Sequence, residues 1–445
     1  MMLKDKKIGL ISLGCDKNRV DSERALALIK ERAILTNEIE NANVVVINTC
    51  AFLESAREEA INTIFEVNSL RENGVLEKIV VTGCLPQKFI GDMFDELVEV
   101  DVFLGFLDYD LLFDALELAY KGERVNFVNK NKKVSIKNRV LTTPCHYSYL
   151  KIADGCNNKC TYCLIPKIRG AYTSVKMEEL IEEAKSLGEL KELILVAQDV
   201  TRYGIDIYGE CKLVELIKEL SKLDNVEKIR LLYCYPDMIT NELIDEIASN
   251  DKVLKYIDIP LQHSENNILK LMNRKGSRES YLKLINTLKE RVKGIAIRST
   301  FITGFPGETD KDFEGLVDFV KKAKLFNAGF FAYSREEDTP AYKLPNQVED
   351  SVKQKRLKKL YAVQQKISCE NLKQFKNTKI KVTCDGIDYE KQSFYGRSDC
   401  FAPDIDGKVY FNYDGVISQG ETYEVLITKT YNYDMYGEAV DEFTE

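Results

Sequence analysis

The chain has 445 residues, which is enough for about three domains of ordinary size. It is 44% hydrophobic and 30% charged, with neither an apolar run of about 18 residues nor a charged and then apolar amino terminus. We therefore expect a cytoplasmic protein that is neither membrane-inserted nor secreted, in which twelve cysteines indicate metal or redox chemistry rather than disulfides.

Three predicted strands near the amino terminus each run directly into a cysteine. The strands are predicted at residues 7–13, 44–49 and 78–83, and the cysteines are Cys15, Cys50 and Cys84. Their intervals of 35 and 34 residues match a strand–helix unit of about 30 or more residues, with helices predicted at residues 21–31 and 53–69. Parallel strands bring their carboxyl ends to one edge, so this pattern predicts a Rossmann-like domain with three converging thiols.

A simpler interpretation is that each of these cysteines is a small buried hydrophobe, as free cysteines often are. That interpretation requires the same register to arise three times independently. Three polar residues, Lys17, Asn18 and Asp21, could lie beside a metal or cluster held by the thiols, or they could cap a helix that begins near Ser22.

Residues 101–139 carry a short strand, a helix and the lysine-rich stretch Lys130-Asn131-Lys132-Lys133. The stretch is more typical of a surface linker than of a nucleic-acid patch. We expect the first domain to end near residue 135 and the second to begin near Thr142.

A strand predicted at residues 147–153 leads into a loop with cysteines at gaps of four and three residues. They are Cys156, Cys160 and Cys163. A closed zinc site needs four protein ligands, whereas three cysteines leave one iron of a four-iron cluster open for a substrate or cofactor. The alternatives are a partial zinc knuckle or three unrelated thiols. The position of the loop directly after a strand favours a functional site, because α/β folds place their active sites at the carboxyl ends of strands.

Six strand–helix repeats follow over about 190 residues. The strands are expected at residues 149–153, 193–197, 229–234, 256–260, 295–302 and 329–333. Helices between them include residues 177–187, 213–223, 241–249 and 310–324. This pattern predicts an open (βα)6 barrel, smaller than the closed eight-stranded form, and its open side would admit a large substrate.

The last part of the chain changes pattern after a charged helical connector at residues 351–373. Short strands separated by Asp-Gly turns are predicted at residues 379–384, 394–398, 408–411, 422–430 and 435–440. They indicate an antiparallel β-barrel of about 70 residues, of the oligonucleotide-binding kind. An inert stabilising cap is the alternative.

These motifs resemble a known family. The C-x3-C-x2-C loop, with Tyr162 before its last cysteine, resembles the signature of radical S-adenosylmethionine (SAM) enzymes. The segments around Cys15, Cys50 and Cys84 resemble the three cluster motifs of the methylthiotransferases, and the terminal barrel resembles their TRAM domain. The resemblance implies three domains, at residues 1–135, 142–373 and 376–445, in an enzyme that inserts a methylthio group into a C–H bond.

The resemblance also implies two 4Fe-4S clusters. One, held by Cys156, Cys160 and Cys163, would cleave SAM, while an auxiliary cluster would be held by the amino-terminal cysteines. Two SAM molecules per turnover are implied, one giving the methyl group and one the radical. The other six cysteines lack such spacing and are expected to be ordinary thiols.

Five further residues are expected to contact SAM. Gln198 and Asp199 follow the second barrel strand, and Arg298 lies at an inward position on the fifth. Tyr162 belongs to the cysteine motif, and Gly304 belongs to a glycine-rich turn that lies close to SAM in the family. That turn has a second explanation, a tight turn in which Thr309 and Asp312 form a capping box.

Charge separates the two substrate classes of the family. Residues 377–445 hold six lysines and arginines against fourteen acidic residues, a net of −8, which equals that of the whole chain. RNA affinity depends largely on basic contacts to phosphate, so an acidic barrel suits a basic protein, although acidity could also serve solubility alone.

The segment from Gly396 to Tyr410 resembles the branch that modifies the β-carbon of an aspartate in the small-subunit ribosomal protein of the decoding centre. We expect that protein to be the substrate and Asp404 and Asp406 to lie on the docking face. The alternatives are a tRNA adenosine methylthiotransferase and a scaffold that only binds nucleic acid. The sulfur donor and the reductant are not indicated by the sequence.

Overall fold

The computed structural model describes residues 3–106, 108–129, 138–413 and 415–440, and the chain divides into two compact units. The first unit comprises the chain up to Thr142 together with residues 154–157 and 163–172. The second comprises the remainder. The lysine-rich stretch Lys130-Asn131-Lys132-Lys133 lies outside the described residues. Within them, no helix is both long and apolar enough to cross a membrane.

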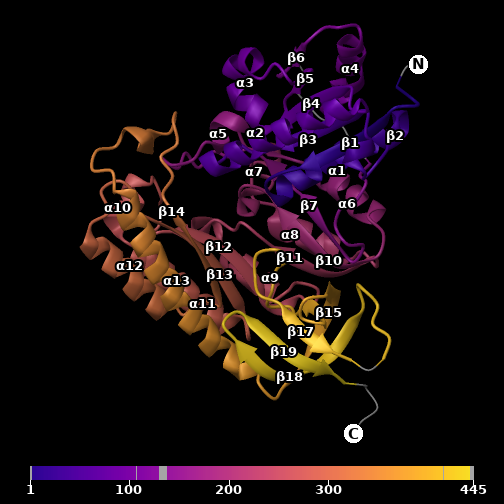
Figure 1. The fold of residues 1–445 in the computed structure, drawn as a ribbon. Helices are drawn as coiled ribbons and strands as arrows, with labels where there is room; N and C mark the ends of the chain where they lie inside the picture. The colour runs from indigo at the N-terminus through magenta and orange to yellow at the C-terminus, as the bar shows by residue number, and fades with distance from the viewer. Residues whose placement is uncertain (1–2, 107, 130–137, 414, 441–445) are drawn as a thin grey trace. The chain divides into compact units, whose positions relative to one another are not determined.

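The first unit is built on a six-stranded parallel sheet in the order β2-β1-β3-β4-β5-β6 (Figure 1). Its strands are β1 (Lys7–Ser12), β2 (Ile34–Leu35), β3 (Val44–Thr49), β4 (Lys78–Gly83), β5 (Val102–Leu104) and β6 (Val125–Phe127). Its helices are α1 (Asp16–Arg32), α2 (Glu54–Ser69), α3 (Cys84–Glu96), α4 (Leu112–Tyr120) and α5 (Ile165–Ile168). The three strands predicted to lead into cysteines are confirmed.

The central strand β3 explains why this sheet is buried on both faces. All six of its residues are buried, as is usual for a strand rich in Val and Ile in a parallel sheet covered on both faces. Val45 and Ile47 pack into one hydrophobic core and Val44 and Val46 into another, because successive side chains of a strand point to opposite faces.

Helix α1 begins earlier than the sequence suggested. Its first residue is Asp16 and its N-cap is Cys15, so a start near Ser22 is wrong. Lys17, Asn18 and Asp21 lie inside the helix, where all three are buried. The capping interpretation of these residues is therefore wrong as well.

The second unit begins with the predicted open (βα)6 barrel, whose strands form two parallel three-stranded sheets, β7-β10-β11 and β12-β13-β14. The strands are β7 (Tyr147–Lys151), β10 (Leu190–Val196), β11 (Val226–Leu231), β12 (Tyr256–Gln262), β13 (Ala296–Thr303) and β14 (Asn327–Ala332). Helices α6 (Met177–Ser186), α7 (Ile205–Tyr208), α8 (Leu213–Ser221), α9 (Asn241–Ser249), α10 (Asn266–Leu271), α11 (Arg278–Arg291) and α12 (Asp310–Ala323) connect them. Two short strands, β8 (Ala153–Asp154) and β9 (Thr173–Ser174), flank the cysteine loop. The predicted capping box of Thr309 and Asp312 at the start of α12 is confirmed.

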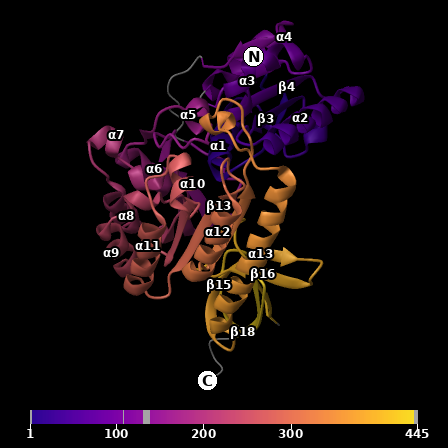
Figure 2. The same ribbon diagram turned by 90° about the vertical axis from the view of Figure 1, so that its left-hand side faces the viewer.

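Helix α13 (Asp350–Leu372) leads from the open barrel to the terminal domain (Figure 2). That domain is a closed barrel in the order β15-β16-β17-β19-β18. Its strands are β15 (Lys379–Asp388), β16 (Ser393–Arg397), β17 (Val409–Asn412), β18 (Thr422–Tyr431) and β19 (Asp434–Ala439). The predicted small barrel is confirmed, with one difference: β17 pairs with β19 in parallel, so the barrel is not wholly antiparallel.

A chain of buried charges joins the terminal barrel to the open barrel. Glu192 of β10 accepts hydrogen bonds from Arg230 of β11 and, at 2.7 Å, from Arg397 of β16. Arg397 also donates to Asp385 at 2.8 Å, and Asp385 pairs with His146 at 2.7 Å. Although burial opposes its charge, the two arginines hold the pKa of the Glu192 carboxyl below its ordinary value.

We expect Glu192→Gln to destabilise the second unit by about 3 kcal/mol or more, because Arg230 would lose its buried ion-pair partner and Arg397 would keep only Asp385. The measurement is the free energy of unfolding, or the midpoint of thermal unfolding where refolding fails. The matched control is Glu227→Gln on the neighbouring strand, whose carboxylate makes a more exposed pair with Lys191 at 3.1 Å. The control should change stability by no more than about 0.5 kcal/mol. Equal effects of the two substitutions would contradict the importance of the buried chain.

Candidate iron–sulfur and cofactor site

The three amino-terminal cysteines follow the carboxyl ends of three neighbouring strands. Strands β1, β3 and β4 lie side by side, Cys15 is the N-cap of α1, Cys50 follows β3 directly, and Cys84 is the first residue of α3. Gly14 has φ +92°, and a Cβ on it would stand 2.7 Å from Cβ of Cys50. The loop of Cys15 therefore packs directly on the loop of Cys50 and needs glycine there.

The three thiols differ in burial. Cys15 is exposed, Cys50 is intermediate and Cys84 is buried. Burial raises the pKa of Cys84 to about 11 and also raises the pKa of Cys50, although the guanidinium of Arg169 acts against both shifts. Without a metal these two groups are protonated thiols, and binding a metal would displace their protons.

Asn18 connects the loops that carry these cysteines. Its side-chain amide donates to the carbonyl of Leu13 at 3.1 Å and to the carbonyl of Thr49 at 3.1 Å. Its Oδ1 lies 3.7 Å from the sulfur of Cys84. A single buried side chain of α1 thus touches the segments before Cys15 and Cys50 and the third cysteine itself.

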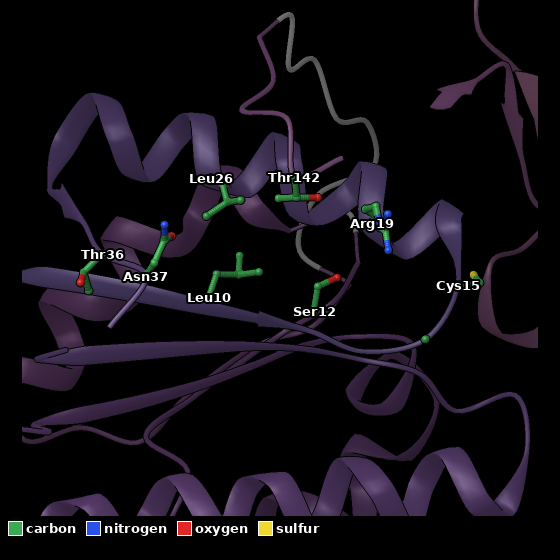
Figure 3. A pocket seen from close by; sticks show the side chains of 9 residues that line it. Leu10, Ser12, Cys15, Arg19, Leu26, Thr36, Asn37 and Thr142 are labelled. Carbon is green, nitrogen blue, oxygen red and sulfur yellow. The ribbon is translucent and has the colours of Figure 1, made fainter. Parts of the chain in front are cut away.

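A cavity of about 280 Å³ lies beside Cys15. Figure 3 shows it between β1 and α1, with Leu10 and Ser12 on the strand and Arg19 and Leu26 on the helix. Cys15 stands at the end where the strand passes into the helix. Of the three amino-terminal cysteines, Cys15 alone lines it.

The second cysteine set lies on a loop whose residues are divided between the two units. In the first unit, the N–H of Cys156 donates to the carbonyl of Gly170 at 3.1 Å, and the sulfur of Cys163 accepts from the N–H of Ile165 at 3.4 Å. In the second unit, the sulfur of Cys160 lies 3.9 Å from Nη1 of Arg274. The metal-ligand roles of all three remain predictions.

The donors of both cysteine sets are thiol sulfurs, the ligands that iron–sulfur clusters take. Among the described residues, no group of three His, Cys, Asp or Glu side chains is placed to hold a single metal ion. Two sets of three soft sulfur donors, without a fourth, fit clusters that each keep one open iron.

Gln198 and Asp199 differ in what they could offer a cofactor. Oε1 of Gln198 is buried and accepts no hydrogen bond from any residue in the described part of the chain, so it could accept one from a bound molecule. Asp199 is already engaged, with Asn158 of the cysteine loop at 2.9 Å, Arg202 at 3.0 Å and Thr201, whose turn it caps. Its clearest task is to hold Asn158.

Tyr162 and Gly304 lie in one packed region of the second unit. The ring of Tyr162 meets the ring of Phe305 edge-on at 6.4 Å. Gly304 has φ +74°, and a Cβ on it would stand 2.3 Å from Cγ of Lys353, so that lysine already covers it. The carboxylate of Glu308 holds this turn by accepting from the N–H groups of Gly304 and Phe305.

Arg298 forms two ion pairs within the second unit. It lies near the amino end of β13, where it pairs with Asp258 at 2.9 Å and with Asp406 at 3.4 Å. Gly304 follows the opposite end of the same strand. Arg298 therefore joins the open barrel to the terminal barrel, and its contact with SAM stays a prediction.

Asp404 and Asp406 differ in exposure. The side chain of Asp406 is fully buried, accepting from Tyr256 at 2.7 Å and from Asn327 at 2.8 Å in addition to its pair with Arg298. A residue held in this way cannot meet a partner, so its place on a docking face is wrong. Asp404 is exposed and stays a prediction.

Sequence reasoning missed Arg169 and Arg274 and left Asn18 undecided. Each is a polar side chain buried beside a cysteine: Arg169 near Cys84, Arg274 near Cys160 and Asn18 near Cys84. The nearest of these pairings spans 66 residues, so no local pattern announces it. The only signal was the clustering of polar residues directly after Cys15.

Comparison with known proteins agrees with this architecture. Models of three families match: the Radical SAM superfamily at residues 150–320, uncharacterized protein family UPF0004 at residues 7–105, and the TRAM domain at residues 378–440. The solved structure of TsrM from Kitasatospora setae, a radical S-adenosylmethionine methyltransferase with cobalamin and a 4Fe-4S cluster bound, is 13% identical. It has a TM-score of 0.53 over 76% of this chain and 77% of that chain. The fold is that of a radical SAM enzyme.

Sequence relatives refine the class. The ribosomal protein uS12 methylthiotransferase RimO of Clostridium tetani is 46% identical and is matched over 98% of both chains. That of Lachnoclostridium phytofermentans is 45% identical over 97% of this chain and all of the relative. The chain belongs to the RimO family of radical SAM methylthiotransferases.

The contacts of Asn18 lead to a prediction about the metal-free protein. Asn18→Ala removes both donors that hold the carbonyls before Cys15 and Cys50, and it should cost about 1–3 kcal/mol of stability. Because the loops loosen, the buried thiol of Cys84 should be alkylated faster by iodoacetamide, as followed by mass spectrometry.

Asn43→Ala is the matched control, since the Asn43 amide connects Lys7 and Glu77 at the amino ends of strands in the same sheet. It should leave the alkylation rate of Cys84 unchanged. If both variants exposed Cys84 equally, Asn18 would have no special place at the cysteine edge.

Proposed function

We propose that this protein inserts a methylthio group at the β-carbon of an aspartate in ribosomal protein uS12, using SAM and two 4Fe-4S clusters. The observation that carries the proposal is identity of 42–46% over nearly the whole chain with relatives named ribosomal protein uS12 methylthiotransferase, and the aspartate β-carbon is the target that the resemblance of residues 396–410 implies. The chain also holds both cysteine sets. The alternative of a tRNA adenosine substrate is not favoured by these relatives.

The cysteine loop holds the proposed SAM-cleaving cluster. Cys156, Cys160 and Cys163 would be its thiolate ligands, and a cluster bound there supplies the electron that breaks a carbon–sulfur bond of SAM. The guanidinium of Arg274, stacked 4.0 Å from the ring centre of Tyr235, stands near Cys160.

Gln198 is the side chain best prepared to bind the cofactor. Its buried Oε1 acceptor would be costly to leave unpaired in the loaded enzyme, and a hydroxyl or amino group of SAM supplies a donor. Asp199 would act indirectly, by fixing Asn158 of the cysteine loop. Tyr162 and Gly304 would shape the turn packed against that loop.

The amino-terminal cysteines would hold the auxiliary cluster, whose open iron suits it to carry the sulfur to be transferred. Exposure decreases from Cys15 to Cys84, so such a cluster would sit at the edge of the sheet with one side toward solvent. A sulfur source and the substrate must both reach the open iron, and the exposure of Cys15 is consistent with that access.

The terminal barrel would receive the protein substrate. Its acidic excess supports association with a basic protein by charge complementarity, and exposed Asp404 is the residue we place on that face. The same acidity opposes binding of RNA phosphates.

The first test separates the roles of the cysteine sets in the anaerobically reconstituted protein. Replacing Cys15, Cys50 and Cys84 together by Ala should halve the iron content while reductive cleavage of SAM to 5′-deoxyadenosine continues. Replacing Cys156, Cys160 and Cys163 should abolish that product. Methylthiolation of uS12 should be lost in both variants.

A third variant, with Cys145, Cys211 and Cys369 replaced by Ala, controls for the loss of three thiols and should keep all its iron. Persistence of 5′-deoxyadenosine without Cys156, Cys160 and Cys163 would contradict the assignment of the radical site. Modification of tRNA adenosine with uS12 left unchanged would contradict the substrate.

The second test concerns docking. Asp404→Lys should weaken binding of uS12 several-fold by placing a positive charge against a basic partner, and the loss should shrink at high ionic strength. Cleavage of SAM should be unaffected. Glu59→Lys, an identical charge change at an exposed position of α2, is the control. Equal loss of uS12 binding in the two variants would show a general charge effect and remove Asp404 from the docking face.

A further inference from the structure

Arg169 occupies an unusual place in the first unit. It comes six residues after Cys163, directly after the short helix α5. Leu164 and Ile168 of the same segment are buried in the core beneath α3, which holds the backbone in place. The Arg169 side chain is 2% exposed. The segment after Cys163 thus places a buried positive charge in the unit that also contains Cys15, Cys50 and Cys84.

The two terminal nitrogens of this guanidinium have different partners. Nη1 donates to two carboxylates, Asp21 of α1 at 2.9 Å and Asp154 at 2.8 Å. Nη2 donates to Oδ1 of Asn18 and points to the sulfur of Cys84 at 3.5 Å. The planar fork of arginine makes this possible, because contacts on one nitrogen fix the direction of the other.

The surroundings are more than a buried salt bridge needs. One carboxylate is enough to neutralise the guanidinium, and both carboxylates lie on Nη1. The ring of Phe106, 4.7 Å from the guanidinium carbon, packs against it. Nη2 is left to Asn18, which connects the cysteine loops, and to Cys84. The two carboxylates thus fix the orientation of the guanidinium, and its Nη2 faces Asn18 and the sulfur of Cys84.

We propose that Arg169 is a positioning residue of the auxiliary cluster, which fixes the sulfur of Cys84 and raises the reduction potential of the cluster held by Cys15, Cys50 and Cys84. The inference rests on the second cluster proposed above. An N–H donor and a positive charge beside a ligand sulfur stabilise the form of the cluster with one more electron. The effect is strong in a buried site, where solvent does not screen the charge.

Arg169 also gives the two cysteine sets a shared structural element. Arg169 lies six residues after Cys163 in sequence. Its partner Asp154 lies two residues before Cys156, so both residues of this pair flank the second cysteine set. Asp21 and Cys84 belong to the sheet domain. The auxiliary site is therefore completed by residues outside the amino-terminal domain, and residues 1–135 alone lack its cation.

The experiment measures the reduction potential of the auxiliary cluster by redox titration followed by electron paramagnetic resonance. The full chain is used with Cys156, Cys160 and Cys163 replaced by Ala, so that one cluster gives the signal. In this background, Arg169→Gln keeps hydrogen-bonding capacity but removes the charge, and it should shift the potential to a lower value. Arg169→Lys keeps the charge, so its potential should lie closer to that of the unchanged Arg169.

Arg139→Gln is the matched control, because Arg139 is a buried arginine of the same unit that pairs with Glu23. It should lower stability as Arg169→Gln does and leave the potential unchanged. An unchanged potential in Arg169→Gln, or a shift of equal size in Arg169→Lys, would overturn the role of Arg169 while a cluster is present. Absence of any cluster from the background protein would instead overturn the two-cluster proposal and this inference with it.

Discussion

Parallel pairing of strands determines where the chemistry of this chain can lie. In the first unit β1, β3 and β4 are neighbours with a common direction, so the residues that follow them meet at one edge whatever their separation in sequence. Individual residues then bring the loops after these strands into contact. Asn18 ties two of the loops, and a glycine at position 14 lets them touch.

The opposite, amino-terminal side of the open barrel has a different use. There Glu192 and Arg298 pair with Arg397 and Asp406 of the terminal barrel, and Asp258 pairs with Arg298 on the neighbouring strand. Buried charges of this kind contribute little net stability compared with apolar packing, yet removing one partner is costly. They are therefore suited to fixing one orientation of the terminal barrel, which a smooth hydrophobic contact would not do.

The repeating pattern of the sequence was enough to predict the architecture, whereas the roles of single polar residues depended on distant partners. Strand positions followed from apolar runs, and the cysteine edge followed from strand direction. The pairs of Arg298 with Asp258 and Asp406 could not be predicted, because an inward position on a barrel strand does not identify partners 40 and 108 residues away. Asp406 was misassigned because its partners, Tyr256 and Asn327, are 150 and 79 residues away.

The burial of Asp406 hardly changes the acidic excess of residues 377–445, on which attraction of a basic substrate depends. The junction uses two acidic residues of the terminal barrel, Asp385 and Asp406, and one basic residue, Arg397. The other residues of this region keep nearly all of the excess of fourteen acidic over six basic groups. Long-range attraction of a basic protein depends on that sum, while the point of contact depends on exposed side chains such as Asp404. The net charge of the domain therefore does not depend on which of its acidic residues are buried. The identity of its docking residues does, because only exposed side chains can contact the substrate.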